Sequence, residues 1–90
     1  MNVRWHVYFS GRVQGVGFRY TCVQQSRHHA VAGWVKNLGD GRVEMIVEGQ
    51  SSELETYLQS VSEATHGSVA DTQTIKSAAT GEFTAMSVVH

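Results

Sequence analysis

The order in which strand-like and helix-like stretches follow one another limits this chain of 90 residues to very few folds. Residues 3–10 alternate apolar and polar side chains, which is the period of a half-buried strand. The apolar side chains of this first strand are Val3, Trp5, Val7 and Phe9. Glycines interrupt the pattern at positions 11, 15 and 17, and residues 18–30 then contain neither glycine nor proline. Those residues are predicted to form a helix with an apolar face of Phe18, Cys22, Val23 and Ala30.

Two strands, a helix and two more strands are predicted for the remainder of the chain. Residues 33–37 and 42–48 indicate a β-hairpin, whose reversal takes its positive-φ positions from Gly39, Asp40 and Gly41. Residues 51–64 place Leu54, Tyr57, Leu58 and Val61 at helical spacing, and Ser52 with Glu55 matches a capping box. Residues 69–76 and 83–89 are predicted to be strands joined by a turn at 78–81.

This order, β, α, β, β, α, β with one additional strand, predicts an α+β fold of the ferredoxin-like split βαβ sandwich type. Such a fold has a largely antiparallel five-stranded sheet with two helices on one face. The first two strands then run parallel with the third between them, because crossovers are right-handed. The glycine stretch and Asn37 are therefore expected at the same edge, about 10 Å apart. We expect residues 1–90 to form a single domain.

Composition excludes several classes of function. The net charge of −1 creates no field that would attract a nucleic acid or another polyanion. Cys22 is the single cysteine, so no intramolecular disulfide is expected. No apolar run approaches the roughly 20 residues of a membrane span. The expectation is a cytoplasmic monomer that binds neither membrane nor nucleic acid.

The glycine-rich stretch GRVQGVGFRY, residues 11–20, is the main candidate for a functional site. Glycine lets a ligand approach the main chain, and free amides at a helix N-terminus bind phosphate-sized anions. Arg19 adds a planar guanidinium that fits two phosphate oxygens. The alternative is a plain strand-to-helix turn with solvated arginines. The stretch lacks both the Gly-Lys-Ser/Thr of a P-loop and the third glycine of a dinucleotide fingerprint.

Two segments resemble the signatures of one enzyme family. GRVQGVGFR, residues 11–19, is similar to the phosphate-loop signature of the acylphosphatases, and GWVKNLGDGRVEMIVEG, residues 33–49, resembles their second signature. The resemblance implies metal-independent and cofactor-free hydrolysis of acyl phosphates to a carboxylate and inorganic phosphate. It also implies that inorganic phosphate or sulfate competes with the substrate.

The resemblance further assigns roles to residues. Arg19 and the loop amides of Gln14, Gly15, Val16, Gly17 and Phe18 would bind the phosphoryl group. Asn37 would position the attacking water. The chemistry is consistent, since a carboxylate leaving group needs no general acid and Asn37, which does not titrate, can hold a water but cannot act as a base. We expect the proton to pass to the substrate.

Other polar and reactive residues are interpreted as structural. Arg12 is read as a solvated turn residue, Lys36 as facing away from the site, and Cys22 as a buried inert thiol. Glu44 and Glu48 are expected to face solvent on one side of their strand. The histidines show no zinc-ligand spacing, so no metal site is expected.

Two other classes of function remain as alternatives. The loop could bind phosphate or an acyl phosphate for regulation, with no turnover, although a pure anion sensor needs no water-positioning amide. The fold could bind RNA, but residues 42–49 carry Glu44 and Glu48 where an RNA-binding strand has aromatic and basic residues. A carbamoyl phosphate substrate is a further possibility within the same chemistry.

Overall fold

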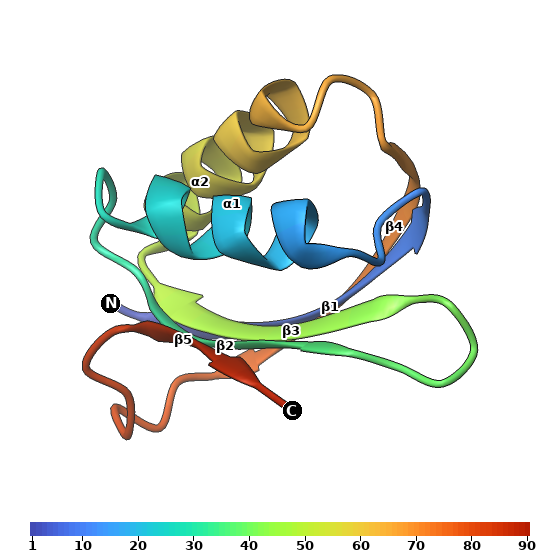
Figure 1. Cartoon of the computed structure of the whole chain (residues 1–90). Helices are drawn as coiled ribbons and strands as arrows, with labels where there is room; N and C mark the ends of the chain where they lie inside the picture. Colours follow the sequence, from blue (N-terminus) through green and yellow to red (C-terminus); the bar gives the residue numbers. More distant parts are fainter.

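In the computed structural model, two helices cover one face of a five-stranded sheet (Figure 1). The structure describes residues 1–90, with the exception of the side chain of Val16. The strands are β1 (Val3–Gly11), β2 (Ala32–Asn37), β3 (Val43–Gly49), β4 (Val69–Ala78) and β5 (Met86–Val89). The helices are α1 (Val16–Ser26) and α2 (Ser51–Ala64). The predicted α+β sandwich is therefore confirmed.

The strand order in the sheet is β4-β1-β3-β2-β5. β3 pairs antiparallel with both β1 and β2, so β1 and β2 run parallel with β3 between them, as predicted. β4 pairs antiparallel with β1, and only β5 forms a parallel pair, with β2. The ends of β1 and β2 that precede α1 and the hairpin thus lie at the same edge of the sheet.

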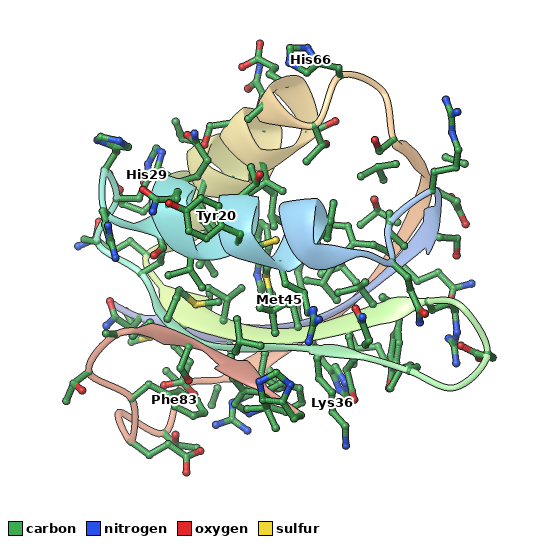
Figure 2. All side chains as sticks on the ribbon, in the orientation of Figure 1. Tyr20, His29, Lys36, Met45, His66 and Phe83 are labelled. Carbon is green, nitrogen blue, oxygen red and sulfur yellow. The ribbon has the colours of Figure 1, made fainter. Side chains whose placement is uncertain are left out.

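The core lies between the helices and the sheet. The alternation in β1 is confirmed, because Trp5, Val7 and Phe9 are buried while their neighbours in the strand are partly exposed. Leu54, Tyr57 and Val61 of α2 are completely buried against it. Figure 2 shows Met45 of β3 between the sheet and α1, whereas Lys36 points to the opposite face. The spacing of apolar residues in the sequence therefore predicts correctly which faces of β1 and α2 are buried.

Helix ends depart from the predictions. α1 begins two residues before the predicted start and ends at Ser26, so Ala30 is exposed beyond the helix and does not belong to its buried face. The capping box is wrong, because Gln50 is the N-cap of α2 and no side chain caps it. Ser52 lies within the first turn, where its carbonyl accepts a hydrogen bond from the Thr56 hydroxyl at 2.8 Å.

The hairpin and the last strand also differ in detail. Of the three predicted positive-φ residues in the β2–β3 turn, only Gly41 has positive φ, at 97°. Asp40 instead closes the turn by accepting hydrogen bonds from the backbone and side chain of Arg42. Phe83 lies outside β5, because residues 79–85 form a loop that precedes the strand.

Glu48 corrects another expectation, since it is buried and does not face solvent. Its carboxylate accepts hydrogen bonds from Arg4 at 2.7 Å and from the backbone amides of Thr80 and Gly81 at 2.9 Å each. Burial opposes ionisation, but these donors outweigh it and lower the pKa of Glu48 to about 2. Glu48 therefore ties the loop before β5 to the centre of the sheet. In the described part of the chain, no helix is long and apolar enough to cross a membrane.

Candidate active site

The glycines between β1 and α1 occupy their positions for different physical reasons. Gly11 has φ of 119°, and a Cβ there would lie 2.5 Å from the carbonyl oxygen of Ser68, so the close passage of the two backbones requires glycine. Gly15 is the N-cap of α1, with φ of 134°. Gly17 has neither a positive φ nor any atom within 4 Å of an added Cβ. Nothing in the protein itself therefore requires glycine at position 17, which fits a backbone left open for a ligand.

The N-terminus of α1 offers free donors to that open space. The first amides of a helix have no intrahelical partners, and glycine at the N-cap provides no side chain to satisfy them. No acidic residue lies in the first turn of α1, whereas α2 has Glu53 at the equivalent place. The positive end of the α1 dipole is thus not neutralised, and it favours an anion.

Gln14 connects this loop to the β2–β3 hairpin. Its side-chain amide donates hydrogen bonds to the carbonyl oxygen of Leu38 and, at 3.1 Å, to that of Arg42. Leu38 directly follows Asn37, so the loop and the end of β2 lie beside each other, as expected from the strand order. The role of the Gln14 side chain escaped the sequence analysis, which considered only its backbone.

Asn37 is the last residue of β2 and lies on the helix-covered face of the sheet. It is two residues after the completely buried Val35, and residues two apart in a strand share a face. Its Oδ1 is buried and has no hydrogen-bond partner in the described structure. An orphaned buried acceptor of this kind costs about 1–3 kcal/mol, so it marks a place for a missing donor such as a water molecule.

Arg19 has a buried hydrogen-bond donor that, like the acceptor of Asn37, has no partner among the described residues. It lies in α1, next to the buried Phe18, and its Nε is buried without a hydrogen-bond partner among the described residues. Its side chain lines a shallow pocket together with Val88 of β5. Val88 is the register partner of Val35, which puts its backbone about 8 Å from that of Asn37 by standard strand spacings.

The structure thus gathers the predicted residues around one end of the sandwich. The backbone of Gln14, Gly15, Val16, Gly17 and Phe18 forms the turn into α1, Arg19 follows in α1, and Asn37 ends β2. The loop glycines line one pocket, whereas Arg19 lines another that faces β5. The Val16 side chain lies outside the described structure, but its predicted contribution is a backbone amide. The arrangement combines anion-binding amides, one guanidinium and one carboxamide, which suits a phosphoryl group with a water beside it.

Other titratable groups do not join this arrangement. Cys22 is fully buried, and burial raises the pKa of its thiol to about 12, which confirms an inert thiol. Arg12 is exposed and its backbone amide donates to the carbonyl oxygen of Ser68, but the residue also lines the pocket beside Gly15 and Gly17. Among the described residues, no three histidine, cysteine or acidic side chains are placed to hold a metal ion. The sequence analysis also missed Tyr20 and Val88, which line the Arg19 pocket and belong to no signature.

Comparison with known proteins points to one family. A family model described as acylphosphatase matches residues 5–86 of the chain. A protein named acylphosphatase from Marinobacter nauticus is 39% identical over 88 residues, which cover 97% of this chain and 96% of the relative. One from Bacillus velezensis is 48% identical over 59 residues, which is 66% of each chain.

Solved structures agree with these sequence matches. The crystal structure of acylphosphatase from Bacillus subtilis superimposes with a TM-score of 0.88 at 34% identity, covering 98% of this chain and 99% of the other. The likeness therefore extends over both helices and all five strands.

Proposed function

The chain belongs to the acylphosphatase family of hydrolases acting on acid anhydrides, and we propose that it hydrolyses acyl phosphates without a metal, using Arg19, Asn37 and the amides of the glycine loop. The observation that carries this assignment of residues is the pair of orphaned buried atoms, Arg19 Nε and Asn37 Oδ1. One is a charged donor and the other a neutral acceptor. A bound phosphoryl oxygen would satisfy the first and a water molecule the second.

The phosphoryl group would bind at the N-terminus of α1. Amides of Gln14, Gly15, Val16, Gly17 and Phe18 would donate to its oxygens, together with the guanidinium of Arg19. The open space beside Gly15 and Gly17 supports this placement, because a Cβ at either position would meet no described atom within 4 Å apart from those of the adjoining residues. Negative charge spreads over the equatorial oxygens during phosphoryl transfer, so these donors would stabilise the transition state more than the ground state.

Asn37 would hold the attacking water through its Oδ1. The water oxygen forms a bond to phosphorus while the bond from phosphorus to the bridging oxygen breaks, and the carboxylate leaves with the electron pair. One water proton then passes to a phosphoryl oxygen, which gives inorganic phosphate. A carboxylate has a conjugate-acid pKa of about 4–5, so it leaves without a general acid. No step in this scheme requires a metal or another cofactor.

Hydrolysis of benzoyl phosphate in the presence of EDTA tests this proposal. Wild-type protein is expected to turn over the substrate equally well with and without EDTA. The variants Arg19→Ala and Asn37→Ala are each expected to lose about 3–4 kcal/mol of transition-state stabilisation, a few hundredfold in rate. Arg19→Lys is also expected to be poor, because an ammonium does not reproduce the planar fork.

Arg27→Ala provides the matched control, since Arg27 is an exposed arginine at the opposite end of α1. It is expected to retain most of the activity. Circular dichroism of each variant checks that the fold persists. Near-normal turnover by a folded Arg19→Ala or Asn37→Ala protein would remove that residue from the mechanism, and loss of wild-type turnover in EDTA would contradict metal independence.

The same binding site would take inorganic phosphate or sulfate as competing anions. We further propose that the chain acts as a monomeric single domain in the cytoplasm and binds no nucleic acid. The charge of −1 supports the last point. Competitive inhibition by phosphate and the mass measured by light scattering test the binding and the oligomeric state.

A further inference from the structure

A second, apolar pocket adjoins the proposed phosphate site. It lies between α1 and β5, has a volume of about 250 Å³, and is lined by Arg19, Tyr20, Val88 and His90. Figure 2 shows Tyr20 on α1, and the pocket joins it to Val88 of β5. The surface of the pocket is predominantly apolar, although an arginine forms one wall. Arg19 therefore belongs to both sites.

The exposure of Tyr20 requires an explanation. Its side chain is 62% exposed, and it stands among the few large apolar residues that the structure leaves in solvent. Val88 lies on the helix-covered face of the sheet, in register with the buried Val35, and packs against the core only in part. The Tyr20 ring and part of Val88 thus face solvent beside a guanidinium whose Nε has no hydrogen-bond partner among the described residues. Such a surface suits a ligand with an anionic end and an apolar end.

We propose that this pocket binds the acyl group of the substrate and gives the enzyme a preference for acyl phosphates with an aromatic ring or a short apolar chain. The inference rests on the proposed function of Arg19 as a phosphoryl ligand. In an acyl phosphate a single bridging oxygen separates phosphorus from the acyl carbon, so a phosphoryl group on Arg19 places the acyl group within reach of Tyr20 and Val88. The volume is just below the roughly 300 Å³ at which small-molecule pockets begin, which limits the acyl group to about one ring.

A pocket on the other side of the glycine loop is the competing location. It has a volume of about 310 Å³ and is lined by Gly15 and Gly17 of the loop, by Phe18 and Ala64, and by five polar side chains, among them Arg12 and Gln14. Most of its side chains are polar, so that pocket would favour a charged or hydroxylated acyl group over a ring. The two locations therefore predict opposite preferences.

The test compares benzoyl phosphate with acetyl phosphate for wild-type protein and for Tyr20→Ala. The measured quantity is kcat/KM for each substrate. Wild-type protein is expected to prefer benzoyl phosphate, and Tyr20→Ala to lose at least about fivefold in kcat/KM for benzoyl phosphate while changing less than about twofold for acetyl phosphate. Taking the variant-to-wild-type ratio for each substrate cancels the difference in their intrinsic reactivity.

Three further variants test whether the effect comes from the aromatic ring of Tyr20. Tyr20→Phe keeps the aromatic surface and is expected to retain the wild-type preference. Ile75→Ala removes another large exposed side chain, 60% exposed on β4, and is expected to leave both substrates unaffected. Arg12→Gln changes the polar pocket and is expected to leave the preference unchanged.

The outcomes separate this inference from the proposed function. An equal loss for both substrates in Tyr20→Ala, or no loss for either, would overturn the acyl pocket while leaving the hydrolase intact. A change of preference in Arg12→Gln would move the acyl group to the polar pocket and also overturn it. The inhibition constant of inorganic phosphate, which has no acyl group, is expected to be the same in wild type and Tyr20→Ala. Failure of wild-type protein to hydrolyse either substrate would instead defeat the proposed function.

Discussion

Gly17 is a residue that the fold does not require to be glycine but that ligand binding could. Its φ is not positive, and an added Cβ would meet no atom within 4 Å, so alanine fits the backbone without strain. Alanine also favours a helix over glycine by about 1 kcal/mol, and Gly17 lies in the first turn of α1. Glycine at position 17 thus makes the ligand-free protein less stable than alanine would, and no contact within the described protein explains the choice.

We therefore expect Gly17→Ala to gain stability and lose activity. Chemical denaturation is expected to show an increase of about 0.5–1 kcal/mol in the free energy of unfolding. The affinity for inorganic phosphate, measured by calorimetry, is expected to fall because the methyl group occupies the space beside the loop amides. Gly41→Ala is the contrasting variant, since its φ of 97° makes alanine strained. A Gly17→Ala protein that binds phosphate as wild type does would show that the ligand does not approach this backbone.

At the level of single residues, the residue types and signatures predict candidate site positions, but no local pattern predicts what these side chains contact. Asn37 and Arg19 are found from the signatures, yet the orphaned state of their buried atoms depends on how β2, β5 and α1 pack. Gln14 illustrates the same limit, because its bonds to Leu38 and Arg42 join segments 24 and 28 residues away. Pairing over such separations is set by topology, which local patterns do not contain.

The loop between β4 and β5 is the element whose position depends most on one side chain. Glu48 of β3 accepts hydrogen bonds from the amides of Thr80 and Gly81 and forms an ion pair with Arg4, which also contacts Glu82. β5 follows directly and carries Val88, a wall of the Arg19 pocket. The buried carboxylate thus fixes the edge strand that lines the pocket.

This arrangement predicts a loss of stability in acid. The pKa of Glu48 lies near 2 in the folded protein and near 4.5 as its ordinary value. A lowered pKa stabilises the fold fully above pH 4.5, and the contribution disappears as the pH falls from 4.5 to 2. Glu48→Gln is expected to lose about 2–4 kcal/mol at pH 7 and to show a flatter stability profile over that acidic range. Urea unfolding at a series of pH values measures both effects, and parallel profiles for the two proteins would contradict the assignment.

Among the elements, strands and their buried faces are predicted better than helix ends and turns. The alternation of apolar residues predicts β1 correctly, and the helical spacing of Leu54, Tyr57 and Val61 predicts α2 correctly. Both patterns work because the apolar positions are the buried ones. Glu48 shares a strand face with Glu44, as predicted, but Arg4 of β1 and the loop after β4 cover it and supply the partners that make its burial tolerable. The capping box failed because Gln50, which carries no preference for that role, ends up as the N-cap.

At the scale of the whole molecule, ligand binding and folding are linked through the same site. A ligand that binds only the folded protein raises its stability by about 2.7 kcal/mol at 100 times its dissociation constant. Inorganic phosphate is expected to raise the melting temperature of the wild-type protein, and the increase continues with the logarithm of its concentration above the dissociation constant. Arg19→Ala is expected to lose this increase, and sodium chloride at matched ionic strength controls for general salt effects. An equal rise in both proteins would indicate binding elsewhere.

The unsatisfied atoms of Arg19 and Asn37 also bear on how such a sequence changes over generations. A buried polar atom that no water reaches costs about 1–3 kcal/mol, so each would lower the free energy of unfolding of the empty protein by up to that amount. Replacement of either by an apolar residue of similar size would relieve that frustration. A lineage that no longer needed the reaction would therefore be expected to shed these two side chains early, while the surrounding sandwich persisted.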